Sequence, residues 1–296
     1  MARLYTKGQV VFNIFNYIIL ITTACICLAP FVNMFAISFS ASAPVSAGMV
    51  GFWPIGFTTQ SYEFAMKEGK FVTALIVSIK RVLLGVSINL VFMVFAAYPL
   101  SKSKDKFSFR NFYMVFFVIT MLISGGMIPT YIVIVKLGLI NTLWSLVLPA
   151  AIPVSTMVVL MNFLRQMPPD IEEAAMIDGA GIFRRLWSVM LPLMKPALAT
   201  VGLMCTVMHW NDWFWGIIYM NEPSKFPLQS YLHKMLSTIE QMMRLANIDY
   251  TRLLAMMNAR TGRASQLFLA TVPMMIVYPF LQKYFTKGLV IGSVKG

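Results

Sequence analysis

Long apolar runs, each near the length of a bilayer-spanning helix, dominate this chain. Hydrophobic residues make up 58% of its 296 positions and charged residues only 12%. A helix needs about 20 mostly apolar residues to cross the hydrocarbon core of a bilayer, where lipid offers no hydrogen bonds to an exposed backbone. The sequence therefore predicts an all-α membrane protein with six transmembrane helices, near Val11–Phe35, Ala74–Leu100, Phe112–Val135, Leu143–Leu164, Leu198–Met220 and Gln266–Phe285.

Basic residues are distributed unevenly among the short loops between these runs. Lys102, Lys104, Lys106 and Arg110 follow the second run, whereas only Lys136 follows the third. Short cytoplasmic loops are enriched in Lys and Arg, so the loop after the second run and both chain termini are predicted to face the cytoplasm. Basic residues at helix ends suit anionic lipid head groups, which accounts for the net charge of +13 without a nucleic-acid partner.

The first apolar run has an alternative interpretation as a cleaved signal peptide, because Arg3 and Lys7 precede it and small residues follow at 41–43. The run is much longer than the apolar core of a signal peptide, which has about 7 to 15 residues. We therefore predict a retained helix and a single transmembrane domain over 1–296, with a core of about 70–286.

Two longer segments, 40–70 and 221–263, are predicted to lie on the external side. In the second, apolar residues recur at helical spacing between 228 and 243, with charged residues between them. This pattern predicts an amphipathic helix that packs on the outer rim of the protein or receives an external partner.

The supply of metal-ligating and nucleophilic residues is small. Cys25, Cys27 and Cys205 lie within predicted spans, and His209 and His233 complete the imidazole supply. Neither a disulfide framework nor a metal site is predicted from these residues. The phosphate-binding pattern G-x-x-x-x-G-K-[ST] is also missing from the sequence. We therefore expect the chain to carry no cofactor and to have no catalytic residues.

A polar island at 168–196 interrupts the apolar pattern between the fourth and fifth runs. Two prolines open it, and Asp170 with Glu173 three residues later matches a capping box. A short helix is predicted over Ile171–Asp178, ended by Gly179 and by a second glycine two residues later. A second helical segment, at 182–190, is predicted to complete an elbow on the cytoplasmic surface, led back to the bilayer by two further prolines.

Two partners suit this elbow. Ile171, Ala174, Ala175 and Asp178 recur at helical spacing, which predicts a narrow face for close approach to another protein. Lipid head groups are the alternative, since the second segment carries two arginines and a tryptophan. The acidic residues of the first segment gain nothing from an anionic leaflet and favour a basic protein pocket. They are Glu172, Glu173 and Asp178.

The spacing within the island resembles the EAA loop of binding-protein-dependent ABC importer permeases. Glu173-Ala174-Ala175 is followed by Gly179 and then, after nine residues, by Val189-Met190-Leu191-Pro192. Val189 stands where the family favours Ile, a change that largely preserves volume. Other segments are similar to the carbohydrate branch of the family, most closely to the smaller, maltose-permease-like subunit of the oligosaccharide subgroup. They are Phe52-Trp53-Pro54, Ala97-Tyr98-Pro99, Trp210-Asn211-Asp212 and residues 278–285.

The resemblance implies a type I ABC importer permease fold with a cytoplasmic coupling helix, in the bacterial cytoplasmic membrane. It implies a heterodimer with a second permease, two cytoplasmic ATPase subunits that bind ATP and Mg, and an extracellular or periplasmic sugar-binding protein. Closure of the ATPase dimer would move the elbow and switch the exposure of an oligosaccharide pathway. Glu173 would be the anchoring charge of an ATPase-coupling set made of Glu172, Glu173, Ala174, Ala175, Asp178 and Gly179.

Polar residues in the fifth run are candidates for the substrate path, because polar groups within a membrane usually face a cavity or a partner helix. On a continuous helix, Trp210 and Trp213 share one face and His209 and Asp212 another, with Asn211 between them. Indole rings stack on sugar rings, and the polar groups suit sugar hydroxyls. The alternative is an interfacial aromatic belt beside a structural His–Asp pair.

Lys80 and Arg81 lie near the external start of the second run. Snorkelling to water is the favoured interpretation. If the two residues instead face the pathway, an acidic oligosaccharide becomes the better substrate.

Three alternative functions stay open at this point. The first is an ABC permease for a solute other than a sugar, and the second is a proton-coupled transporter that uses His209 and Asp212 as a relay. The third is a membrane-embedded enzyme, for which two polar side chains are too few. The cytoplasmic elbow favours an ABC permease over the second.

Overall fold

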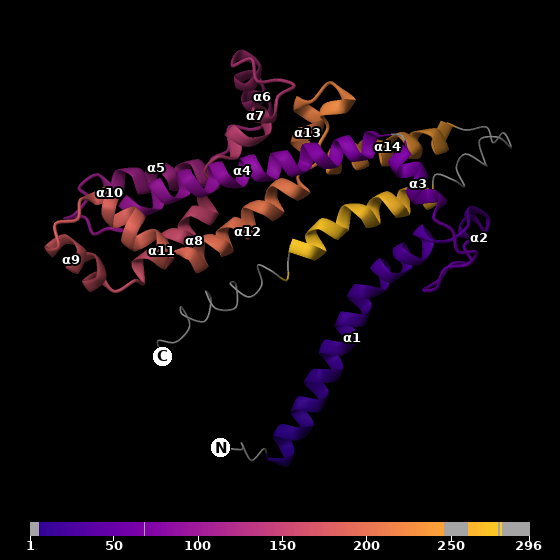
Figure 1. The fold of residues 1–296 in the computed structure, drawn as a ribbon, viewed down its shortest axis with the longest axis horizontal. Coiled ribbons are helices and arrows are strands. Elements are labelled where there is room, and N and C mark those ends of the chain that lie inside the picture. The colour runs from indigo at the N-terminus through magenta and orange to yellow at the C-terminus, as the bar shows by residue number, and fades with distance from the viewer. Residues whose placement is uncertain (1–5, 68, 246–259, 278, 280–296) are drawn as a thin grey trace. The chain divides into compact units, whose positions relative to one another are not determined.

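The structure is a computed structural model that describes residues 6–67, 69–245, 260–277 and 279. Every regular element in these ranges is a helix, as the sequence predicts. The chain forms two compact units, one of Met1–Phe71 with Leu236–Thr271 and the other of Val72–Met235 with Val272–Gly296. Figure 1 labels the helices along the chain.

The first unit is dominated by α1, Lys7–Ser38, one continuous helix. Thr6 begins it with a capping box, in which the Thr6 hydroxyl accepts from the Gln9 amide and the Gln9 side chain accepts from the Thr6 amide. Most apolar side chains of α1 are exposed, which suits lipid rather than water. The other helical segments of this unit are α2 (Ser42–Ser46), α3 (Gln60–Lys67) and residues 236–245 and 260–271.

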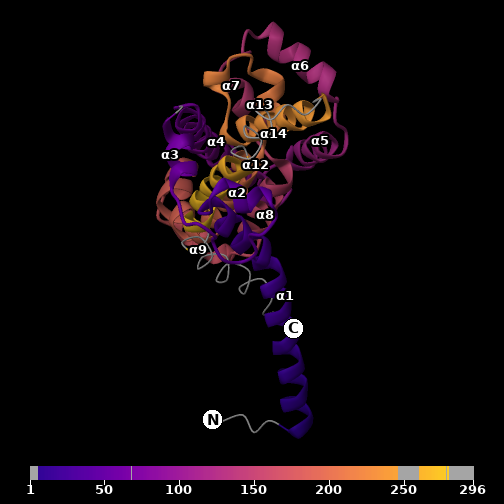
Figure 2. The same cartoon turned by 90° about the vertical axis from the view of Figure 1, so that its right-hand side faces the viewer.

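The second unit contains the long helix α4 and the elements that pack around its length. Figure 1 shows α4, α8 and α12 side by side, with α9 at the end of this bundle where α4 ends, and Figure 2 shows the bundle nearly end-on. Methionine and leucine side chains from these helices form the main core. The helices are α4 (Lys70–Ser101), α5 (Arg110–Leu122), α6 (Met127–Lys136), α7 (Leu143–Val147), α8 (Val154–Arg165), α9 (Pro169–Ile177), α10 (Ile182–Arg184), α11 (Leu191–Leu193), α12 (Lys195–Asn211), α13 (Phe214–Tyr219) and α14 (Leu228–Leu245).

Single turns of other helix types connect several of these elements. A 3-10 turn, η1, covers Leu148–Ala150, and another, η3, covers Pro223–Lys225. A π-helical segment, η2, covers Arg185–Met190. Because η2 lies between α10 and α11, the second segment of the predicted elbow is helical from 182 to 193.

Only part of the predicted span pattern is continuous helix. Gly8–Ser38 and Lys70–Ser101 are unbroken and apolar enough to cross a bilayer. In three further cases two apolar helices meet at a bend, of 111° between α5 and α6, 49° before α8 and 78° before α12. Among the described residues, up to five spans therefore exist if each bent pair counts as one. The predicted sixth run, 266–285, is helical at 266–277 and at 279, and its other residues lie outside the described part of the chain.

The bends follow from glycine and proline within the apolar runs. Gly126, at φ +83°, lies between α5 and α6, a backbone conformation that L side chains rarely adopt. Pro153 precedes α8, whose first turn has no need of the missing amide hydrogen. Hydropathy alone treats these runs as uniform, so it predicts straight helices in their place.

The elbow helix α9 is close to its predicted range but begins differently. Pro168 is its N-cap and makes no side-chain hydrogen bond, so the predicted Asp170 capping box is wrong. Pro169 instead occupies the first turn, where its fixed φ suits a helix and no amide is left without a partner.

The end of α9 matches the prediction. Gly179 has φ +75°. Its amide donates to the Met176 carbonyl at 3.0 Å, and the Ala180 amide donates to the Ala175 carbonyl at 2.9 Å. This Schellman arrangement needs a left-handed residue after the helix, which glycine supplies most easily.

Candidate functional site

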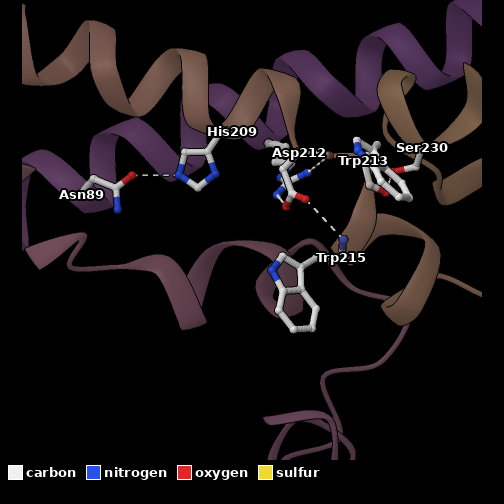
Figure 3. Close-up of polar contacts among 7 residues, drawn as sticks. Asn89, His209, Asp212, Trp213, Trp215 and Ser230 are labelled. Carbon is white, nitrogen blue, oxygen red and sulfur yellow. Dashed lines mark hydrogen bonds and ion pairs between the residues drawn. The ribbon is translucent and has the colours of Figure 1, made fainter. Parts of the chain in front are cut away.

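The predicted substrate-path residues lie at a break in the helix. α12 ends at Asn211, and Asp212 has an extended backbone with ψ 105° before α13 begins at Phe214. The Asp212 Oδ1 accepts from the Trp215 amide at 3.3 Å and so caps the start of α13. Figure 3 shows this contact. The predicted fifth span is therefore two helices joined at Asp212.

Arg81 of α4 binds this break. One guanidinium nitrogen forms an ion pair with the Asp212 carboxylate, and the other donates to the Asp212 carbonyl at 2.9 Å. Arg81 is 2% exposed, so the prediction that it snorkels to water is wrong. A guanidinium presents its donors as a planar fork, which suits a neighbouring carboxylate and carbonyl. Lys80, one residue earlier, is exposed.

His209 has a different partner. Asn89 of α4 donates through its amide nitrogen to the Ala150 and Ala151 carbonyls at 2.6 and 2.9 Å, which leaves its amide oxygen for His209. The His209 Nε2–H therefore donates to the Asn89 oxygen at 2.8 Å (Figure 3). The expected His209–Asp212 pair does not form, and a proton relay between these two groups gains no support from their contacts.

The two tryptophans do not share a face. Trp210 is 5% exposed, whereas Trp213 is 41% exposed and stacks on the His233 ring at 3.8 Å between centroids. The helical spacing that would align them fails because the backbone is extended at Asp212. Within the fifth run, the indole of Trp213 and the side chain of Asn211 are thus the exposed members of the predicted set. An indole beside an amide is suited to a sugar ring and its hydroxyls.

The predicted coupling residues divide between two sides of α9. Ala175 is buried and Glu172 is mostly buried, whereas Glu173, Ala174 and Asp178 are exposed. The face predicted to approach a partner included Ala175, which instead packs within the chain. The large exposed apolar residues on α9 are Ile171, Met176 and Ile177, the last of them 87% exposed.

Glu172 joins α9 to the end of α4. Its Oε1 accepts from the Tyr98 hydroxyl at 2.6 Å, and its Oε2 pairs with the Lys102 ammonium group. Burial acts to raise the pKa of Glu172, but hydrogen bonds from Lys102 and Tyr98 and the charge of Arg185 outweigh it and hold that pKa below its ordinary value. Burial lowers the pKa of Lys102, although Glu172 opposes this. The sequence contained both residues, but nothing in its spacing pointed to this contact.

The described residues contain no group of three or more His, Cys, Asp or Glu side chains arranged to hold a metal ion. Cys25 and Cys27 are exposed on α1, and Cys205 is buried in α12.

The chain was compared with protein families, with curated proteins and with solved structures. No family model matches the chain. Protein LplC of Bacillus subtilis is 38% identical over 298 residues, which cover 98% of this chain and 97% of that protein. The polygalacturonan/rhamnogalacturonan transport system permease protein YtcP of the same species is 33% identical over 285 residues, which cover 96% and 98%.

A solved transporter structure also matches this chain over nearly its whole length. The chain aligns with one chain of a bacterial ABC transporter involved in the import of the acidic polysaccharide alginate. The TM-score is 0.84 and the identity is 30%, over 96% of this chain and 100% of the other. With helices fit for a membrane and relatives aligned over nearly their whole length, this chain belongs to the carbohydrate ABC transporter permeases.

Proposed function

We propose that the chain is the transmembrane subunit of an ATP-driven, binding-protein-dependent importer that moves an oligosaccharide across the bacterial cytoplasmic membrane. The observation that carries the proposal is the surface of α9, where Glu173 and Ile177 are both exposed. A short helix that presents a carboxylate beside apolar side chains fits a cleft with a basic residue in another protein. In this proposal the chain crosses the membrane six times, with α9 and both termini in the cytoplasm.

The partners follow from this role. A second permease completes the pathway, and two cytoplasmic ATPase subunits bind ATP and Mg. An external sugar-binding protein delivers the substrate. Closure of the ATPase dimer moves α9, and the bundle alternates between outward and inward exposure, a two-state coupling between separate sites.

An acidic oligosaccharide is the proposed substrate class. The support is that YtcP is named for polygalacturonan and rhamnogalacturonan, and the aligned transporter for alginate. Arg81 adds nothing to this case because Asp212 occupies its guanidinium. Exposed Lys80 is the remaining basic member of the predicted path.

The test is ATP hydrolysis by the complete complex in lipid vesicles, with its binding protein and a panel of sugars. We expect oligogalacturonides or alginate oligosaccharides to stimulate hydrolysis, and neutral oligosaccharides of equal length to have little effect. Stimulation by neutral sugars alone would contradict the acidic substrate class. A complex that hydrolyses ATP but responds to no sugar would favour the alternative, a permease for another solute.

Substitution of Gly179 tests the role of the elbow turn. A Cβ built on this residue meets no atom within 4 Å, so added bulk alone carries no cost at Gly179. The cost comes from φ +75°, about 1–2 kcal/mol for an ordinary L-residue and more for a β-branched one. We therefore expect Gly179→Val to lower substrate-stimulated uptake severalfold and Gly179→Asn to lower it much less.

Gly181→Val is the matched control for this experiment. Gly181 has φ −63° and, like Gly179, has open space around its Cβ position. Valine is accommodated there without backbone strain, so uptake in vesicles should stay near the unmodified level. Equal losses in Gly179→Val and Gly181→Val would assign the effect to added bulk on the surface and reject the backbone explanation.

A further inference from the structure

We propose that Glu172 is a positioning residue that clamps the elbow helix α9 to the transmembrane helix α4, so that the two move together when the ATPase moves α9. This inference rests on the proposed function and goes beyond it by giving two adjacent carboxylates different tasks. Glu173 faces the partner protein, and Glu172 passes the motion inward to α4.

Three side chains make up the clamp. Tyr98 and Lys102 are four residues apart, so their side chains lie on the same side of the end of α4. Glu172 accepts from the Tyr98 hydroxyl at 2.6 Å through one oxygen and pairs with Lys102 through the other. The Lys102 ammonium group also lies 4.1 Å from the centroid of the Tyr98 ring. Each of the three groups therefore contacts the other two.

Burial and charge make this contact stronger than a surface ion pair. The side chains of Lys102 and Glu172 are 17% and 14% exposed. Arg185, the first residue of η2, adds a second positive charge close enough to act on Glu172. One carboxylate thus balances two cations, from the end of α4 and from the second elbow segment. Removal of its charge leaves two partly buried cations together, which is strongly unfavourable.

The neighbouring carboxylate, Glu173, is exposed to solvent, whereas Glu172 is mostly buried. Glu173 is 54% exposed and lies 3.3 Å from Lys106, which is 47% exposed. Such an exposed pair contributes little to stability and exchanges easily for another basic partner. Successive residues of a helix point about 100° apart, so Glu172 and Glu173 are unable to face α4 together.

In this proposal, α4 transmits the motion of α9 along its length as one continuous helix. It is a single helix over Lys70–Ser101, and Arg81 lies 21 residues before Lys102. At a rise of 1.5 Å per residue, the two residues are about 30 Å apart along the axis. Arg81 holds Asp212 at the break between α12 and α13. One rigid helix therefore joins the elbow to the break beside Trp213.

The first experiment compares two isosteric variants, Glu172→Gln and Glu173→Gln, in the complete complex with its ATPase subunits and binding protein in lipid vesicles. For Glu172→Gln we expect ATPase subunits to remain bound while the ratio of substrate-stimulated to basal hydrolysis falls at least fivefold. For Glu173→Gln we expect weaker retention of the ATPase subunits during purification. A normal stimulation ratio in Glu172→Gln would overturn the clamp.

Two further variants guard against misfolding. Tyr98→Phe removes one hydrogen bond and keeps the ion pair, so it should lower the ratio by less than Glu172→Gln does. Lys102→Met should lower it as much as Glu172→Gln, and the double variant should be no worse than either single one, because both remove the same contact. Additive losses would show that the two residues act separately and would reject the clamp.

A distance measurement separates this inference from the proposed function, because it needs no transported sugar. Spin labels are placed at two exposed sites outside the predicted ATPase-coupling set, Lys104→Cys and Asp170→Cys, after Cys25, Cys27 and Cys205 are replaced by alanine. The distance between the labels should stay constant when a non-hydrolysable ATP analogue binds the ATPase subunits. In Glu172→Gln it should change or broaden.

Failure of the clamp and failure of the proposed sugar transport would give different results. Loss of stimulation by every sugar, with a constant label distance, would reject the sugar substrate and retain the clamp. A label distance that changes with nucleotide in the unmodified complex would reject the clamp and leave the importer function standing.

Discussion

Replacement of Asp212 by alanine will destabilise the protein by about 3–5 kcal/mol, the usual cost of removing one partner from a buried ion pair. Arg81 is almost fully buried in α4, and its guanidinium would lose its counter-charge. The Trp215 amide would also lose the carboxylate that caps the start of α13. The measurement is the fraction of monodisperse protein that survives heating in detergent, followed by size exclusion and converted to a midpoint.

A double substitution sharpens this prediction. Arg81→Met with Asp212→Leu replaces both charges by apolar groups, and such a replacement is often neutral or favourable where removal of one partner is costly. The double variant should therefore be more stable than Asp212→Ala or Arg81→Met alone. Asp105→Ala, which removes an exposed carboxylate from the loop after α4, is the control and should leave the midpoint unchanged. A double variant that is worse than both singles would show that the pair is not the source of the stability.

Substitution of Gly85 by alanine is the second large effect that we expect. Gly85 lies in α4 against the ring of His209, and an added Cβ would be 2.7 Å from two of the ring carbons and in closer conflict with Nε2. The ring is held by its hydrogen bond to buried Asn89, so it has little room to move. Overpacking of this kind costs about 1–3 kcal/mol, more than the roughly 1 kcal/mol that alanine gains over glycine in a helix.

Gly202→Ala provides a matched control on the facing helix. Gly202 lies in α12, and a Cβ there would be 3.8 Å from a methyl carbon of Leu90, an ordinary contact. This variant should be as stable as the unmodified protein or gain up to about 1 kcal/mol from helix propensity. Unfolding midpoints of the two variants, measured side by side, give the comparison. A Gly85→Ala protein as stable as Gly202→Ala would mean that α4 and α12 do not approach each other this closely.

The predicted elbow shows which local features a sequence specifies well. Two prolines ended the previous helix, and Gly179 ended α9 within one residue of the predicted position. These residues act through their own backbone, by fixing φ or by allowing a positive φ, so their effect is readable without knowledge of the fold. The Asp170 capping box was wrong because Pro169 already suits the first turn. Where two local patterns predict different helix starts, only the structure shows which start forms.

The arrangement of the substrate-path residues could not be predicted from local sequence patterns. Trp210 and Trp213 were expected on one face because the fifth run was treated as continuous helix. The extended backbone at Asp212 separates them, and it is held by Arg81, 131 positions away. The candidate set was predicted from the sequence because polar groups within an apolar run usually face a cavity or a partner helix, and its role in transport stays a prediction. Their grouping depended on a partner that hydropathy does not identify.

The sequence by itself determined the helical membrane class, the position of the elbow and the resemblance to sugar importers. These properties depend on composition, on run length relative to the bilayer, and on proline and glycine at single positions. Only the tertiary structure decided which apolar runs bend and which polar groups pair. Glu172 meets Tyr98 across 74 positions and His209 meets Asn89 across 120. Such pairs form because the packing of α4 brings distant groups into a medium where each needs a partner, a condition that no single stretch of the chain contains.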